Sequence, residues 1–478
     1  MRSTFFGLEI GRRALFAHQQ ALDTTSHNIA NANTPGYSRQ VVQLTETTPF
    51  APPSFSRPRL AGMIGTGVEV ASVERLKNEF IEEELRAETQ AAGRWEVRKD
   101  LLSEVELIMT EPSDTGLRAA LDAFWTSLED LAVNADQGPA RSLVIQRAIA
   151  LADGFRQTYA QLKQLQDSIN KSIGVKVDQI NQLASQIANL NDQIMKATAA
   201  GLDPNDLKDQ RDLLVKDLSK IIDVQLIEGK LGDVTVTVSG TLLVDGLEAR
   251  SLAAVPDPSN PSDPNYYQVQ FASTGAKVPV ADGELKGLLE MRDTTIPKYK
   301  DRLDLLAQSI ISEFNAQHQK GYDLNGHQGQ VLFTGTGAVD FGVNPNIVAD
   351  PSLIAAAATG DPVTPTPAPS DGENALAMAN LKKKLLGALS DQSIDTYFQS
   401  TIAELGVESQ AAEVQAKNHE ALLGHLEQQQ QAVSGVSLDE EMMNLVRFQH
   451  GYNAAARVVS VMDEVIDTII NRLGAGRY

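Results

Sequence analysis

The C-terminal segment of the chain carries the pattern that most constrains its fold. From Leu438 to Leu473, apolar residues keep helical steps of three and four, with one polar position at Gln449. A single helix over this span is about 54 Å long, well beyond the roughly 30 Å of a compact domain. We therefore expect this helix to pack against a partner helix rather than against the surface of a compact domain. Its predicted packing residues are Leu438, Met442, Leu445, Tyr452, Val459, Met462, Ile466 and Ile469.

The N-terminal segment offers a second apolar stripe. This stripe consists of Leu8, Leu15, Leu22 and Ile29, which recur every seven residues. The pattern predicts a helix that ends just before Pro35 and Gly36, because proline disfavours a helical residue before it and glycine permits a left-handed turn. We expect the two terminal helices to pair as a coiled-coil-like rod. The alternative is that each end packs separately on its own neighbours.

The segments between the termini predict a mainly α fold with an inserted β-rich domain. Residues 74–222 are nearly all helical in pattern, whereas residues 223–285 contain short β-branched runs separated by glycines, which is typical of hairpins. Residues 286–392 predict a helix from Pro297, loops and a Pro-rich linker. The expected domains are 1–73 with the N-terminal helix, 74–222 as a helical bundle, 223–285 as the small β domain, 286–392, and 393–478 with the C-terminal helices.

Composition excludes several classes of function. The chain has 41 Lys and Arg against 62 Asp and Glu, and a net charge of -21 repels nucleic acid and anionic lipid. There is no Cys, so disulfides, thiolate metal sites and a Cys nucleophile are impossible. The first thirty or so residues lack the apolar core and cleavage site of a secretory signal, and we expect no membrane insertion.

Motifs for catalysis or metal binding are incomplete. His419-Glu420 begins like a zinc-protease helix, but Leu423 occupies the place of the second His. In the run from Asp323 to Gly326 the glycine falls at the fourth place of a calcium loop rather than the sixth, so a polar turn is the better interpretation. The sequence therefore predicts no enzyme, no cofactor and no metal site.

Two terminal motifs resemble a known family. The run from Leu22 to Gln40 is similar to the N-terminal signature of the flagellar rod, hook and hook-associated axial proteins, and the run from Ser434 to Tyr452 resembles the C-terminus of the hook-associated members. A third run, 207–214, resembles their helix before the β-rich domain. The signature residues are Asn28, Asn31, Asn33, Pro35, Gly36, Tyr37, Arg447, Phe448 and Gln449.

Some of these residues also have a purely local interpretation. Ser437 with Glu440 forms a capping-box pattern, and the acids that follow Ser437 oppose the helix dipole. The three asparagines could simply end a helix, or their amides could bind the next subunit.

The resemblance implies a structural subunit at the junction between hook and filament, needed for filament assembly. It implies self-association in a helical ring or layer, with hook protein below and a second junction protein, hook-associated protein 3, above. It further implies export through the flagellar type III apparatus to an extracellular place, and a dedicated export chaperone held by Leu445, Phe448, Tyr452 and Val459.

Three alternatives stay open at this point. A hook or rod subunit is the nearest, because these proteins share the N-terminal signature. A cell-wall hydrolase would need a positioned pair of acids, which nothing in the sequence marks. A signalling coiled coil would need a membrane anchor.

Overall fold

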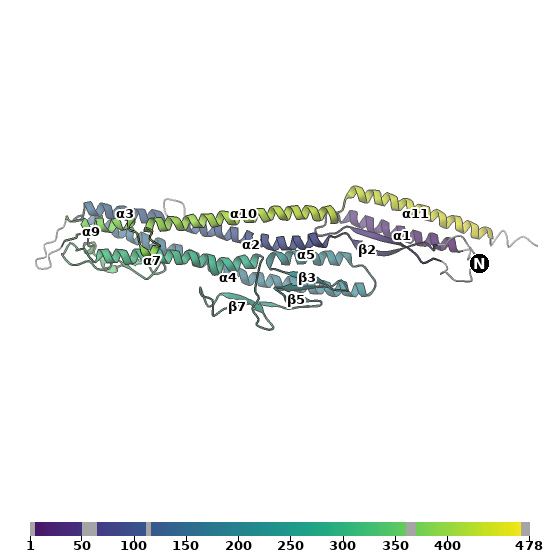
Figure 1. The fold of residues 1–478 in the computed structure, drawn as a ribbon, viewed down its shortest axis with the longest axis horizontal. Helices are drawn as coiled ribbons and strands as arrows, with labels where there is room; N and C mark the ends of the chain where they lie inside the picture. Colours follow the sequence, from purple (N-terminus) through teal and green to yellow (C-terminus); the bar gives the residue numbers. More distant parts are fainter. Residues whose placement is uncertain (1–4, 50–64, 111–115, 360–369, 470–478) are drawn as a thin grey trace, which may run out of the picture. The chain divides into compact units, whose positions relative to one another are not determined.

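The computed structural model describes residues 5–49, 65–110, 116–359 and 370–469, and these form two compact units (Figure 1). The first unit comprises Met1–Thr89, Ile180–Ser251 and Glu420–Tyr478, and the second comprises Gln90–Gln179 and Leu252–His419. The expected mainly helical fold with small antiparallel sheets is confirmed. Most of the Pro-rich linker, at 360–369, lies outside the described residues.

The first unit holds both terminal helices. They are α1 (Phe6–Ala30) and α11 (Leu438–Asp467). Helix α5 (Asn205–Ile221) belongs to the same unit. The unit also contains the beginning of α2 (Glu79–Thr110) and the ends of α4 (Gly138–Ala199) and α10 (Ile394–Ser434).

Two antiparallel sheets complete the first unit. One is a ribbon of β1 (Gln40–Glu46) and β2 (Val68–Arg75), with a register shift between Gln43 and Leu44. The other has the order β3 (Gln225–Glu228), β4 (Val234–Val238), β5 (Thr241–Asp245) and β6 (Glu248–Ala249). The β4–β5 hairpin turns tightly because Ser239 and Gly240 both adopt positive φ, at 47° and 78°.

The second unit is a helical body with an aromatic core. Its longer elements are the remaining parts of α2, α4 and α10 together with α3 (Leu117–Val133) and α7 (Ile296–His318). The ring centres of Phe124 and Phe314 lie 5.2 Å apart, and each lies within 5.2–5.8 Å of those of Trp125 and Phe333. Such tilted ring contacts add to the stabilisation from burial alone.

The shorter elements of the second unit follow the chain in order. The helical ones are α6 (Glu284–Glu290), the π-helix η1 (Met291–Thr295), α8 (Pro345–Ala349), α9 (Glu373–Ala379) and the 3-10 turns η2 (Pro351–Leu353), η3 (Asn380–Lys383) and η4 (Gly387–Leu389). The strands pair as β7 (Leu252–Pro256) with β8 (Tyr267–Phe271) and β9 (Phe333–Thr334) with β10 (Gly342–Val343).

The structure differs from the sequence expectations in the middle of the chain. Residues 223–285, expected as one inserted domain, are divided: β3–β6 belong to the first unit and β7–β8 to the second. Lys277 forms an isolated bridge to Gln270, outside the named strands. The helix expected from Pro297 continues upstream through η1 to Glu284. A π-helical turn opens the backbone, and this lets the helix continue past a proline that would otherwise clash with the carbonyl four residues earlier.

Candidate assembly interface

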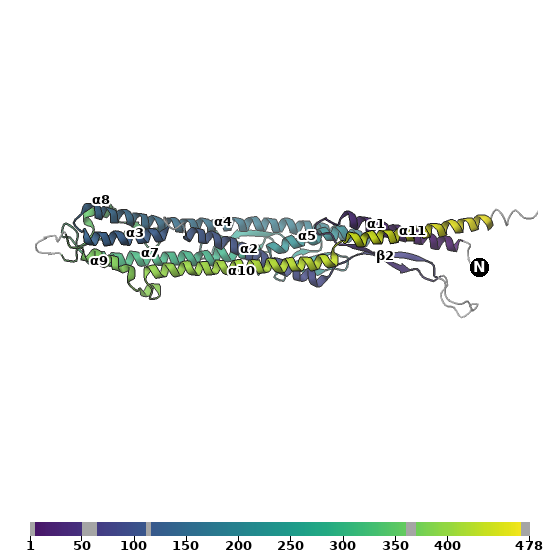
Figure 2. The same cartoon turned by 90° about the horizontal axis from the view of Figure 1, so that it is seen from above.

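Helices α1 and α11 lie side by side as an antiparallel pair, as both views show (Figures 1 and 2). Their register follows from close contacts at glycines. A Cβ atom added at Gly7 would come within 2.6 Å of Met462 Cε, and one added at Gly11 within 2.8 Å of Val459 Cγ2. Near the middle of the pair, Gly451 leaves room for the ring of His18. The pairing expected for the terminal helices is therefore present.

The buried face of α1 is made of small and polar residues. Gly11, Ala17, Ala21, Thr25 and Asn28 are its buried positions. The stripe expected to pack, which is Leu8, Leu15, Leu22 and Ile29, is only half-buried and flanks this face. Side chains without bulk let the two helix axes come close, and the leucines then cover the sides of the contact.

The packing residues expected on α11 divide into two groups. Leu445, Tyr452, Val459, Met462 and Ile466 are half-buried. By contrast, Leu438 is 51% exposed, Met442 57% and Ile469 39%. The heptad-like pattern thus marks two surfaces, one against α1 and one that faces outward.

Asn28 ties the helix pair to the rest of the first unit. Its amide nitrogen donates to the Gln40 carbonyl at 2.9 Å and to Glu441 Oε2 at 3.0 Å. Its Oδ1 accepts from the Tyr37 hydroxyl at 2.7 Å and from the Gln40 amide at 3.0 Å. Asn28 is 1% exposed, so its side-chain amide is fully buried. The four hydrogen bonds satisfy the donors and the acceptor of that amide. Asn28 therefore belongs to an internal site, and its amide does not face a neighbouring subunit.

The acids at the start of α11 take part in the same network. Ser437 caps the helix by accepting from the Glu440 amide, as its sequence predicts. The carboxylates then reach the signature turn: Arg39 bonds Glu441 at 2.8 Å and Glu440 at 2.7 Å. Glu441 is 2% exposed, so this pair is a buried link between the two chain ends.

The remaining N-terminal signature residues have local roles. The Asn31 side chain donates to the His27 carbonyl and accepts from the Thr34 hydroxyl, which closes the end of α1. Asn33 and Pro35 are exposed. Gly36 adopts the left-handed conformation expected there, with φ of 76°. It packs over Leu213 of α5.

The C-terminal signature residues lie along the helix pair. The guanidinium of Arg447 is 4.8 Å from the centre of the Phe448 ring, whose own centre is 6.4 Å from that of His18. Gln449 is exposed. Burial in this contact lowers the pKa of His18.

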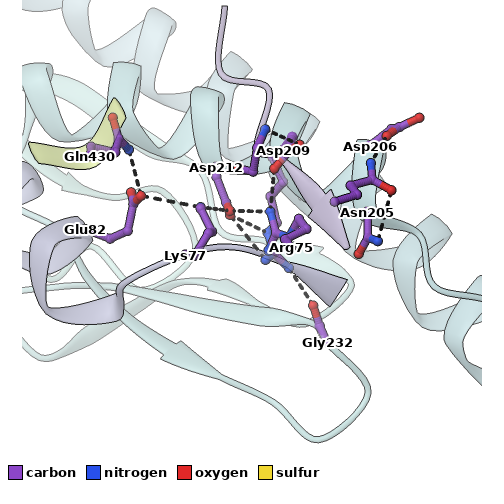
Figure 3. A network of polar contacts seen from close by, with 12 residues as sticks. Arg75, Lys77, Glu82, Asn205, Asp206, Asp209, Asp212, Gly232 and Gln430 are labelled. Atoms are coloured by element: carbon purple, nitrogen blue, oxygen red, sulfur yellow. Dashed lines mark hydrogen bonds and ion pairs between the residues drawn. The ribbon is translucent and has the colours of Figure 1, made fainter. Parts of the chain in front are cut away.

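A polar network on α5 anchors the end of the signature and the end of the ribbon (Figure 3). Asp209 accepts from the Ser38 amide at 2.9 Å and from Arg75 at 2.8 Å. Asp212 accepts from Arg75 at 2.9 Å and from Lys77 at 2.6 Å. These two acids lie three residues apart, so they share one face of the helix. The 207–214 motif therefore binds both the end of the N-terminal signature and the end of the β1–β2 ribbon.

The electrostatics of the two acids differ. Burial alone would raise the pKa of Asp212, but the charges of Lys77, Arg75 and Arg211 outweigh it and hold the pKa at about 2. At Asp209 burial dominates and raises the pKa. Arg211, 2% exposed, donates to the Gly232 carbonyl at 2.6 Å and so attaches the β3–β4 turn to the same helix.

The outward surface of α11 forms two apolar flanks on opposite sides of its contact with α1. Successive residues of a helix are about 100° apart. The first flank is Leu438, Met442 and Val446. Met442 and Val446 directly follow Glu441 and Leu445, which face α1. The second flank is Val458, Val461 and Val465, which each precede a residue that faces α1. All six side chains are 43–57% exposed, and neither flank was separated from the seam by sequence reasoning.

The described residues hold no arrangement for metal chemistry. Across 5–49, 65–110, 116–359 and 370–469, no three His, Asp or Glu side chains are placed to hold an ion. Asp323 accepts from the amides of Asn325 and His327, which is the polar turn expected there. The best-formed hollows in this part of the chain are open depressions, one of them beside Leu107. No helix among the same residues is long and apolar enough to cross a membrane.

Comparison with known families covers the same elements. Residues 102–333 match the family described as flagellar hook-associated protein FlgK helical domain. Residues 8–37 match the flagella basal body rod protein family, and residues 427–473 match the flagellar basal body rod FlgEFG protein C-terminal family. The two terminal matches cover most of α1, including Asn28, and all of α11.

Individual relatives extend the match to the full chain. The flagellar hook-associated protein 1 of Bacillus subtilis is 35% identical over 512 residues and covers 100% of both chains. That of Salmonella typhimurium is 30% identical over 96% of this chain and 98% of its own. The flagellar hook junction protein FlgK from Burkholderia pseudomallei shares the fold, with a TM-score of 0.65 and 20% identity over 73% of this chain and 100% of that one.

Proposed function

The chain belongs to the flagellar hook-associated protein 1 family, and on this premise we propose how it assembles. Its role is structural, at the flagellar hook–filament junction, and its rod and hook relatives imply self-assembly in the axial structure. We propose that the paired terminal helices are the assembling element. The two flanks of α11 support this, since they are apolar, exposed and on opposite sides of the contact with α1.

Flanks on opposite sides suit a subunit with a neighbour on either hand. A ring or helical layer is built from heterologous contacts, in which two different surfaces of each copy meet. In this proposal the first flank of α11 meets one neighbouring copy and the second flank meets another. Full burial of an exposed Val or Leu side chain is worth roughly 1.5 to 3 kcal/mol. The six flank residues are about half exposed, so covering each of them supplies about half of that.

The axial partners and the place of the subunit are proposed from the family resemblance. We place hook protein below this subunit and hook-associated protein 3 above it, with export through the flagellar type III apparatus to the cell exterior. We expect no catalytic activity, in keeping with a structural family.

The export chaperone is proposed to hold α11 before assembly. Its suggested anchors, Leu445, Phe448, Tyr452 and Val459, are half-buried against α1 in the folded chain. Chaperone binding at these positions therefore requires α11 to leave α1. Removal of 438–478 should abolish binding to the purified chaperone, whereas removal of the β3–β6 sheet should not, and unchanged binding of the first variant would contradict the assignment.

Deletion of the gene tests the junction role directly. We expect electron microscopy to show complete hooks without filaments, and immunoblots to show abundant flagellin in the medium. Expression of the intact chain in the same cells should restore filaments. Loss of the hooks would move the subunit to the hook or rod, and normal filaments would contradict the proposal.

A further inference from the structure

Methionine is the only sulfur chemistry available to this chain. The sequence has nine Met and no Cys. Met109, Met291 and Met378 are buried, at 6%, 0% and 0% exposure. Met195 and Met462 are half-buried, and Met462 packs over Gly7 in the helix pair.

Met442 and Met443 form an adjacent pair with a different environment. They are 57% and 65% exposed. Met442 belongs to the first flank of α11, and Met443, one residue later, faces away from α1. Both thioethers are therefore open to reagents in the free subunit, and that of Met442 lies between Leu438 and Val446 of the first flank.

We propose that Met442 and Met443 are a peroxide-sensitive modification site whose oxidation blocks the docking of α11. The inference rests on the proposed role of the flanks in assembly. A lone pair of the thioether sulfur attacks one oxygen of a hydroperoxide, the O–O bond breaks, and a sulfur–oxygen bond forms. The departing oxygen leaves as water or an alcohol after taking up the peroxide proton. The sulfur is oxidised by two electrons and the peroxide is reduced by two.

The effect on docking follows from the polarity of the product. A sulfoxide is polar and chiral, whereas the thioether is flexible and apolar. Burial of that oxygen against an apolar neighbour without a hydrogen bond is costly. Met442 is shielded once the first flank is covered, so its oxidation reports on whether a subunit is free or assembled.

The first measurement uses the purified full chain. Hydrogen peroxide is added, and the gain of one oxygen atom per Met is followed in peptides by mass spectrometry. We expect Met442 and Met443 to be oxidised several-fold faster than Met195 and Met462, with Met109, Met291 and Met378 slowest. Equal rates for the exposed pair and the buried three would overturn the site, whatever the role of α11.

The second measurement uses gene replacement and needs no oxidant. The variant Met442→Gln with Met443→Gln carries a polar amide in place of each sulfoxide, and Met442→Leu with Met443→Leu keeps the surface apolar. We expect the Gln pair to give several-fold fewer filaments than the Leu pair, at equal protein levels. Normal filaments with the Gln pair would overturn the control of docking.

The deletion phenotype separates this inference from the proposed function. If deletion removes filaments and the Gln pair does not, the junction role stands and only the methionine inference fails. If deletion leaves filaments intact, the junction role itself fails.

Discussion

The side-chain amide of Asn28 donates a hydrogen bond to the carboxylate of Glu441 at 3.0 Å, although the two residues are 413 positions apart. Both are almost fully buried. Arg39 bonds the other oxygen of Glu441, so the end of α1, the signature turn and the start of α11 meet at one point. The pairing of the chain ends is therefore coupled to the folding of the signature.

Replacement of Asn28 tests this coupling. Asn28→Ala leaves the Tyr37 hydroxyl, both backbone groups of Gln40 and one oxygen of Glu441 without their partner. We expect a loss of about 2–4 kcal/mol in the local stability of α1, measured by hydrogen exchange of its amides. Exposed Asn33, replaced by Ala, should have little effect. Equal protection of α1 in the two variants would contradict the role of Asn28.

Glycine contacts between α1 and α11 predict opposite effects of one substitution at two sites. Gly11→Leu places a side chain where Val459 already lies, and we expect a loss of about 1–3 kcal/mol from overpacking. Gly424→Leu, on α10, meets open space, and the better helix propensity should stabilise by about 0.5–1 kcal/mol. Thermal unfolding followed by far-UV circular dichroism checks both. Destabilisation by both variants would mean that the room available at each glycine does not determine the change in stability.

The depressed pKa of Asp212 predicts acid sensitivity of the first unit. The pKa falls from an ordinary 3.8 to about 2, so the carboxylate stabilises the folded state above its unfolded pKa and loses this effect as the pH drops through 2. The contribution is about 2 kcal/mol. Hydrogen exchange of α5 between pH 5 and pH 2 should show a shallower loss of protection in Asp212→Asn than in the wild type. Asp217→Asn, at an exposed position of α5, should follow the wild type.

His318 predicts a separate acid transition in the second unit. Its Nε2 accepts from the Ala355 amide at 2.9 Å, so the ring proton is on Nδ1, which donates to the Gln330 carbonyl at 2.6 Å. Burial lowers the pKa from 6.5 to about 4. The neutral ring therefore stabilises the fold above pH 6.5, and about 3 kcal/mol is lost as the pH falls toward 4.

Tryptophan fluorescence can report this transition, since Trp95 and Trp125 both lie in the second unit. Denaturant unfolding at pH 7 and pH 4.5 should give a smaller difference for His318→Gln than for the wild type. Exposed His450, replaced by Gln, should leave the difference unchanged. An unaltered difference in His318→Gln would assign the transition to other groups.

The two flanks of α11 predict that assembly can be blocked from either side without unfolding. Val446→Asp and Val461→Asp each place a charge on one flank, and burial of that charge at a contact is strongly unfavourable. We expect either variant to reduce filament number by at least tenfold with wild-type circular dichroism. Val414→Asp is the matched control, because Val414 is 49% exposed and belongs to α10, which carries neither flank. Normal filaments in both flank variants would contradict the proposed mode of assembly.

Local patterns in the sequence determined the helices and several turns. The long apolar seam from Leu438 predicts a helix that needs a partner, and Ser437 marks its start, because capping and helical periodicity depend on residues close in the chain. Gly36 was predictable for the same reason. The end motifs identified the family, since they are long and specific.

Only the tertiary structure decided which residues of these helices meet. At the contact, Gly11 and Ala21 of α1 are buried in place of its leucines. This is because the distance between two packed helices depends on the size of the side chains on both of them. Asn28 with Glu441, and Asp209 with Arg75, join segments far apart in the chain, and no local pattern encodes such partners. The division of α11 into a buried face and two flanks likewise depends on where α1 lies, so sequence periodicity alone could not separate them.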